Sequence, residues 1–286
     1  MRLSPSALPA RLRPVLDFLF SAILMAAMLM HSGMLSAEPI SVRHMEGTTH
    51  GFLVLRNQQG KELAEGELTQ VVKGHSLISD LVFHFKDGSI DDETTVYSQR
   101  GAFRLIRDHH VQKGPSFPHP IDLSIDASTG QVTVVSTDNG KKKTETDHLD
   151  LPPDLANGLI QTLLKNINPD APETKVSYLA TTPKPRLVTL SIKPQGKERF
   201  RVAGVPHRAM RYDIKTEIGG IAGAIAPLVG KQPKDIYIWI LGGKAPIFVR
   251  MEGELYQGGP VWIVQLTSPV WPNAHSSERE GARSDR

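Results

Sequence analysis

Leu81-Val82-Phe83-His84-Phe85, followed by Lys86-Asp87-Gly88, has an apolar side chain at every odd position and then ends in a turn dipeptide. Alternation with a period of two is typical of a β-strand that has one buried face and one wet face. Asp-Gly is a strong signal for a tight hairpin turn. The stretch therefore predicts a strand over residues 77–86 within an antiparallel sheet.

The same pattern extends in both directions along the chain. Short runs rich in Val, Ile, Leu, Phe and Thr alternate with turn residues, which is the spacing of an antiparallel meander. We expect a mainly β fold, in which a strongly curved antiparallel sheet forms a half-barrel or open barrel. The further expected strands are 51–56, 63–73, 94–99, 102–111, 121–125, 131–136, 235–241, 245–254 and 261–267.

Two segments interrupt the β pattern. Apolar residues recur at helical spacing over 155–167, and Asn168-Pro169 ends the run, so we expect an amphipathic helix that packs on the sheet. The second segment, 218–230, is apolar and rich in glycine, which lowers its helix stability. We interpret it as a short apolar helical segment that is either a buried connection or a flexible apolar lip at the mouth of a cavity.

The N-terminal 37 residues read as a secretory signal peptide. They contain a basic start, an apolar run over 18–30, and small residues before Glu38. A membrane span needs about 20 apolar residues, whereas the apolar core of a signal peptide needs about 7–15. We expect export to the periplasm or beyond, with cleavage after Ala37. The alternative is an uncleaved leader that anchors the chain in the inner membrane.

The rest of the chain is expected to form one β-rich domain over 38–271 and a disordered tail over 272–286. Two β halves that meet near residue 150 are the alternative. The chain has no cysteine, so neither a disulfide nor a lipidated cysteine is expected. Three of the 33 basic and one of the 30 acidic residues lie in the leader, which leaves a net charge of about +1 on the remainder. Nucleic acid is therefore not an expected partner.

Catalytic motifs are mostly absent from the sequence. Asp108-His109-His110 resembles a phosphoesterase signature, but neighbouring strand residues point to opposite faces, which separates His109 from the other two. The nearest acidic group, Asp91-Asp92-Glu93, is assigned to a turn. The sequence has no Gly-x-Ser-x-Gly elbow and no phosphate-binding loop.

Histidines give no metal-binding spacing. His75, His84, His110 and His119 could converge on a metal only if a bent sheet brought their strands together. We therefore expect neither a metal nor a cofactor, and we expect no catalytic residue.

The last third of the chain carries a resemblance. Tyr212-Asp213-Ile214-Lys215, Ile236-Tyr237-Ile238-Trp239-Ile240 and the strand that starts at Ala245 resemble a group of uncharacterised exported bacterial β proteins. Those proteins are in turn similar to the periplasmic lipoprotein carriers LolA and LolB. The resemblance implies a half-barrel whose open side is covered by helices. It supplies no ligand or catalytic residue, and the chain lacks the lipoprotein cysteine of LolB.

These observations favour a noncatalytic, exported binding or carrier protein of the cell envelope. Its concave apolar face would hold an acyl chain, a lipid or an apolar partner segment. The alternatives are a structural or assembly factor with no ligand cavity and, third, a secreted metal-dependent hydrolase. The residues expected to contact a ligand are Leu155, Leu159, Leu163, Ile218, Ile221 and Ile225.

Overall fold

A computed structural model describes residues 38–138, 141–181, 184–202, 205–218 and 233–267. Contacts divide the chain into Met1–Ser36 and Ala37–Arg286, and only the second unit is described below. Within the described ranges, no helix combines the length and apolar character that a membrane crossing requires. The predicted leader and tail, and all of the second apolar segment except Ile218, lie outside the described residues.

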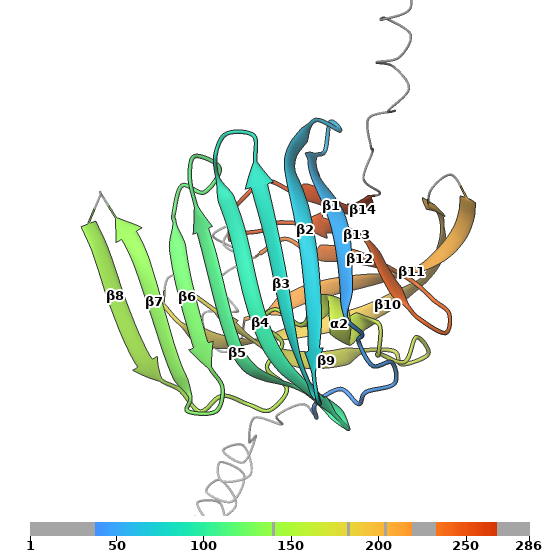
Figure 1. Ribbon diagram of the computed structural model, residues 1–286, viewed down its shortest axis with the longest axis horizontal. Helices are drawn as coiled ribbons and strands as arrows, with labels where there is room; N and C mark the ends of the chain where they lie inside the picture. The colour runs from blue at the N-terminus through green and yellow to red at the C-terminus, as the bar shows by residue number, and fades with distance from the viewer. Residues whose placement is uncertain (1–37, 139–140, 182–183, 203–204, 219–232, 268–286) are drawn as a thin grey trace, which may run out of the picture. The chain divides into compact units, whose positions relative to one another are not determined.

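The fold is one antiparallel sheet of 14 strands (Figure 1). The order across the sheet is β8-β7-β6-β5-β4-β3-β2-β1-β14-β13-β12-β11-β10-β9. The strands are β1 Thr49–Asn57, β2 Glu62–Lys73, β3 Ser76–Phe85, β4 Ile90–Arg100, β5 Ala102–Lys113, β6 Ile121–Asp126, β7 Gln131–Asp138, β8 Lys141–His148, β9 Thr174–Ala180, β10 Arg186–Val202, β11 Val205–Glu217, β12 Ile236–Leu241, β13 Ile247–Gly253 and β14 Trp262–Thr267. The predicted mainly β, antiparallel fold is confirmed, and the sheet is not closed into a barrel.

Two meanders make up this sheet, and they meet at strands from opposite ends of the chain. Strands β1 to β8 follow one another in sequence order, as do β9 to β14. Pairing of β1 with β14 joins the two, with Leu55 opposite Val264. The strands β8 and β9 are consecutive in the chain but form the two edges of the sheet.

The turns explain why neighbours in sequence become neighbours in the sheet. At the turn after β3, Gly88 has a φ of 86°, and the Asp87 carboxylate accepts a hydrogen bond from the Ser89 amide at 2.9 Å. After β6, the Asp126 carboxylate accepts bonds from the amides of Ser128 and Thr129. Aspartate and glycine favour such turns because one bonds its own backbone and the other adopts positive φ freely.

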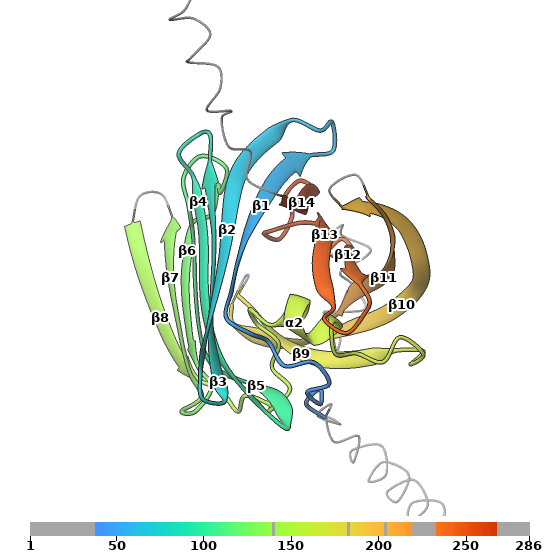
Figure 2. The same cartoon turned by 45° about the vertical axis from the view of Figure 1, so that its right-hand side comes forward.

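The main core lies between the two meanders. Figure 2 shows β10 and β11 curving round on the side opposite β4 to β8, with the helix α2 (Ile160–Leu164) between them. One cluster of buried apolar residues contains members from both meanders and from the α2 segment. At one part of this cluster, Phe117 packs edge-on against Phe85, Tyr256 and Trp262. Burial of each such large side chain contributes roughly 1.5–3 kcal/mol, so this contact between distant segments is a major source of stability.

The helix predicted over 155–167 is shorter than expected. The structure has α2 only over Ile160–Leu164, because the residues before it pair with β9 instead. Leu155 forms a parallel bridge with Ser177, and Gly158 has a φ of 65°, which a right-handed helix does not allow. The apolar periodicity therefore marks buried positions along an irregular segment as well as a helix face.

A substitution at Gly66 in β2 tests the packing of the first meander. A Cβ at this position would lie 2.4 Å from Cε1 of Phe83 and 3.2 Å from Cβ of Leu53. We expect Gly66→Ala to lower the free energy of unfolding by about 1–3 kcal/mol, since the buried ring must move. At the matched control Gly51, on the neighbouring strand β1, the nearest atom would be 3.8 Å away. Gly51→Ala should therefore leave stability unchanged or slightly raised. Equal losses in denaturant titrations of the two variants would contradict this view of the core.

Candidate ligand-binding site

Residues 154–167, which we call the plug, cross the interior between the two meanders. Leu155, Leu159 and Leu163 are 1–2% exposed and belong to the main core cluster. The structure thus brings together three of the six predicted ligand-contacting residues, all on the plug. Ile218, directly after β11, is partly buried, whereas Ile221 and Ile225 lie outside the described residues.

The start of the plug is held to β9 by side chains that bond backbone groups. The Asp154 carboxylate accepts hydrogen bonds from the Ser177 amide at 2.9 Å and from its hydroxyl. The Asn157 side chain accepts from the Leu179 amide at 2.8 Å and donates to the Leu179 carbonyl at 3.1 Å. These bonds satisfy the buried polar groups that an irregular segment inside a core would otherwise leave unpaired.

The end of the plug is held by the segment that precedes β1. The Asn166 side chain accepts hydrogen bonds from the amides of Arg43 and His44 at 2.8 and 2.7 Å. Lys165 Nζ lies 2.8 Å from a carboxylate oxygen of Glu46, and both side chains are largely buried. The plug is therefore attached by polar contacts at its two ends, and by apolar packing between them.

A group of polar side chains lies on the inner face of β4 and β5, and we call it the inner polar cluster. Its members are Asp91, Glu93, Thr95, Asp108 and His110. Register places Glu93 opposite His110 and Thr95 opposite Asp108, so their side chains share one face. His110 Nε2 is 2.6 Å from Asp91 Oδ1, and His110 Nδ1 is 3.9 Å from Glu93 Oε1.

Asp108 is the most buried acid of the inner polar cluster, at 2% exposure. Its Oδ1 accepts a hydrogen bond from the Thr95 hydroxyl at 2.9 Å, while its buried Oδ2 has no hydrogen-bond partner among the described residues. The plug covers this pair closely, since a Cβ on Gly158 would lie 1.9 Å from Thr95 Oγ1 and 2.9 Å from Asp108 Oδ1. Only glycine fits here, both for space and for its positive φ.

The environment of the cluster shifts its proton affinities. Burial, reinforced by the charge of Glu93, raises the pKa of Asp108 to about 7. Burial alone would lower the pKa of His110, but the charges of Glu93 and Asp91 outweigh it and raise that pKa to about 9. Burial also raises the pKa of Glu93, against the effect of the His110 charge, and it raises that of Tyr178 on β9. Below about pH 7, the cluster therefore favours a protonated Asp108 beside a charged His110.

The sequence predicted one part of this arrangement and missed another. As predicted, His109 points to the opposite face from Asp108 and His110. On that face its Nε2 lies 2.9 Å from Asp122 Oδ1. The assignment of Asp91-Asp92-Glu93 to a turn is wrong, because these residues lie in β4. The i, i+2 spacing of Asp91, Glu93 and Thr95 indicates that they share one face of a strand. Only the pairing register with β5 shows that this face also carries Asp108 and His110. Within the described ranges, no group of three His, Cys, Asp or Glu side chains is arranged to hold a metal ion.

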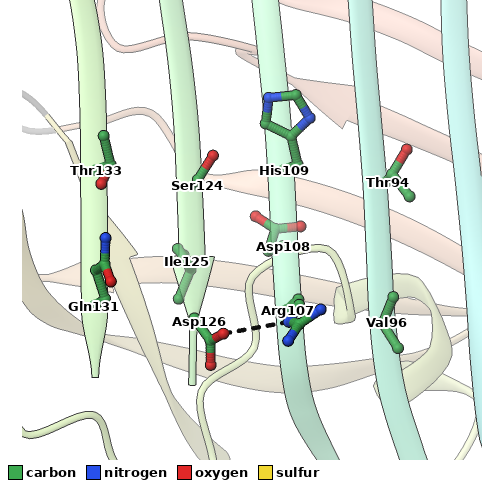
Figure 3. A pocket seen from close by; sticks show the side chains of 10 residues that line it. All are labelled: Thr94, Val96, Arg107, Asp108, His109, Ser124, Ile125, Asp126, Gln131 and Thr133. Atoms are coloured by element: carbon green, nitrogen blue, oxygen red, sulfur yellow. Dashed lines mark hydrogen bonds and ion pairs between the residues drawn. The ribbon is translucent and has the colours of Figure 1, made fainter. Parts of the chain in front are cut away.

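A separate hollow of about 400 Å³ lies on the outer face of β4 to β7 (Figure 3). Register puts Thr94, His109, Ser124 and Thr133 in one row across these strands. Arg107 and Asp126 form an ion pair of 3.2 Å beside the row (Figure 3). Val96 and Ile125 line the hollow together with these polar side chains, so its lining is of mixed character.

Comparisons with known proteins find similarity to solved structures only. No family model matches the sequence, and no curated protein matches it. The crystal structure of a β-barrel-like protein of the domain of unknown function DUF1849 from Brucella abortus is 10% identical, with a TM-score of 0.43, over 80% of this chain and 100% of that chain. The hypothetical lipoprotein YmcC from Escherichia coli K12 is 5% identical, with a TM-score of 0.34, over 78% of this chain and 86% of that chain.

The first of these structures is a domain of unknown function, and the second is a hypothetical lipoprotein. Neither is LolA or LolB, so the resemblance to those carriers stays a prediction. Similarity at this level carries no inference about what the chain binds.

Proposed function

We propose that this chain is an exported, noncatalytic binding protein of the bacterial cell envelope that carries an apolar ligand in the space occupied by the plug. The ligand is an acyl chain, a lipid or an apolar segment of a partner. The observation that supports this is the plug itself, a segment of apolar side chains between two facing parts of one sheet. Leu155, Leu159 and Leu163 would contact the ligand, together with Ile218, Ile221 and Ile225.

The plug has the properties of a segment that can move. Its helix has only five residues, and a helix this short has no stability of its own in water. Its ends are held by polar contacts that water can replace, each with a net contribution of about 0.5–1.5 kcal/mol. The walls on either side of it include apolar residues, such as Tyr97 on β4 and Ile238 on β12, so a displaced plug would leave an apolar space that borders the inner polar cluster.

One observation favours the second candidate, a structural or assembly factor of the envelope. The leucines of the plug are 1–2% exposed, so in the described arrangement they fill the interior themselves. In a structural factor this arrangement would be permanent, whereas in a carrier the ligand would replace it.

A disulfide that locks the plug distinguishes the two candidates. The chain has no cysteine, so Leu155→Cys with Ser177→Cys introduces a single pair at bridged positions, within the usual span of a disulfide. The reduced variant carries the same two substitutions without the covalent bond, so its binding of a fluorescent fatty acid is the reference. The oxidised variant should bind the fatty acid at least about tenfold more weakly than the reduced variant does. The disulfide opposes displacement of the plug by a few kcal/mol.

The control is a second cysteine pair, Thr133→Cys with Thr146→Cys, on the outer face of β7 and β8. The two hydroxyls there are 3.1 Å apart, so the positions suit a disulfide that does not touch the plug. Its oxidation should leave fatty-acid binding unchanged. Absence of binding by the wild type would favour the structural factor, and equal binding by both forms of the plug variant would show that the plug does not move.

A further inference from the structure

The hairpin of β10 and β11 extends beyond the rest of the sheet. The strand β9 pairs with β10 only over Arg186–Ile192, and β12 pairs with β11 only over Ala209–Ile214. Residues 197–202 and 205–208, which we call the distal ribbon, therefore have no strand partner outside the β10–β11 hairpin (Figure 1). A two-stranded ribbon is only marginally stable alone, so we expect other contacts to stabilise this one.

One face of the distal ribbon is cationic. Register places Arg199 opposite Arg208 and Arg201 opposite Pro206, and Lys197 is two residues from Arg199 on the same strand, so these side chains share a face. Lys197, Arg199 and Arg208 are exposed and form no ion pair with any residue that the structure describes. Like charges directly opposite each other destabilise a strand pair. The Arg199–Arg208 pair is thus a position where a bound anion would be favourable.

The opposite face of the ribbon is anchored to the sheet. Glu198 Oε2 accepts a hydrogen bond from Trp239 Nε1 at 2.8 Å, and Glu198 Oε1 lies 3.4 Å from Arg211. Trp239, Val249 and Ala209 form a small buried cluster with partly buried Phe200 packed against it. This anchor fixes the orientation of the ribbon and leaves Lys197, Arg199 and Arg208 exposed on the other face.

The charge of the protein is concentrated at this hairpin. The distal ribbon holds four Lys or Arg residues and one Glu, a net charge of +3. The chain beyond residue 37 carries about +1 in all, so the remainder is net negative. A cationic patch on an otherwise nearly neutral molecule selects and orients an anionic partner over about a Debye length.

We propose that the cationic face of the distal ribbon docks on a membrane surface that carries anionic lipid headgroups. A ribbon presents its cations in a plane, which suits an extended anionic surface, and Val205 at its end is 54% exposed. Lipid is favoured over nucleic acid because the leader predicts export. The surface is remote in sequence from the plug and does not depend on plug movement.

Vesicle binding of the protein recovered from an exporting host tests this docking. The vesicles contain phosphatidylethanolamine and phosphatidylglycerol, and vesicles of phosphatidylcholine provide the uncharged comparison. Each cation near an anionic surface contributes about a fivefold increase in binding, so Lys197→Gln with Arg199→Gln and Arg208→Gln should weaken binding about a hundredfold. Binding by the wild type should also fall steeply as salt is raised from about 0.1 to about 1 M.

The control replaces three exposed lysines elsewhere, Lys61, Lys73 and Lys113, with glutamine. It removes the same charge and should weaken binding only slightly. Circular dichroism and thermal unfolding establish that both variants are folded. Equal weakening in the two variants, equal wild-type binding to charged and uncharged vesicles, or tighter binding to DNA than to vesicles would each overturn the proposal.

Discussion

Replacing Gly158 with alanine is expected to lower the free energy of unfolding by about 3 kcal/mol, the largest loss we expect from a single added methyl group. A left-handed conformation costs an L residue roughly 1–2 kcal/mol, and Gly158 has a φ of 65°. Overpacking adds about 1–3 kcal/mol, since the new Cβ would lie 1.9 Å from Thr95 Oγ1. Denaturant unfolding monitored by fluorescence measures the loss.

Gly74 provides the matched control. Its φ is 63°, but a Cβ there would meet no atom within 4 Å. Gly74→Ala should therefore show only the conformational cost, roughly 1–2 kcal/mol. If the two variants lose the same amount, the plug does not pack against Thr95 and Asp108 as described.

The second large effect is a dependence of stability on pH that originates at Asp108. Its pKa rises from the ordinary value of 3.8 to about 7 in the folded protein, because the carboxyl is buried. The folded state therefore binds this proton more tightly than the unfolded state does. The stabilisation that proton binding at Asp108 contributes is fully present below pH 3.8 and is lost as the pH rises to about 7. At about 1.4 kcal/mol per pKa unit, the loss is on the order of 4 kcal/mol.

Asp108→Asn removes this titration and retains an acceptor for the Thr95 hydroxyl. We expect the variant to match the wild type near pH 4 and to exceed its stability by several kcal/mol near pH 8. His110 contributes with the same sign at higher pH, since its folded pKa of about 9 exceeds the ordinary 6.5. Thermal unfolding across this pH range measures both effects.

A carboxylate on the outer face of the same strands serves as the comparison. Asp122 lies 2.9 Å from His109, and both side chains are about half exposed. Asp122→Asn should follow the wild-type pH profile closely, because a solvated pair contributes little. A wild-type profile that does not decline between pH 4 and 7, or an Asp108→Asn profile parallel to it, would mean that Asp108 titrates normally.

Most strands could be predicted from the sequence because their pattern is local. Alternation at Leu81, Phe83 and Phe85 and the turn at Asp87-Gly88 depend on neighbours a few residues apart, and the structure places β3 over Ser76–Phe85. Pairing of β1 with β14 could not be predicted in the same way, since it joins residues about 200 positions apart in the sequence.

The helix prediction was wrong in extent for a physical reason. Helical spacing over 155–167 records which side chains are buried, and an irregular chain inside a core can bury the same set. The deciding contacts are the bonds of Asn157 with Leu179 and the left-handed Gly158, which depend on β9 and β5. Tertiary contacts of this kind override local propensity.

The candidate sites depended on register and on strand faces. The pairing of β4 with β5 brings Glu93 to His110, and no pattern within either strand contains that information. The cationic ribbon was overlooked for a different reason. Its charges stand at alternate positions 197, 199 and 201, so they form no continuous run, although they share one face of a strand.

An open sheet must also avoid pairing with other copies of itself. The edge strand β8 carries five charged residues in eight, including Lys142 and Lys143, and such edges resist the addition of a further strand. At the other edge, β9, the bridge between Leu155 and Ser177 occupies part of the strand and blocks the addition of a further strand there. Displacement of the plug would uncover that edge, so in the proposed carrier ligand loading and protection against self-association would depend on the same segment.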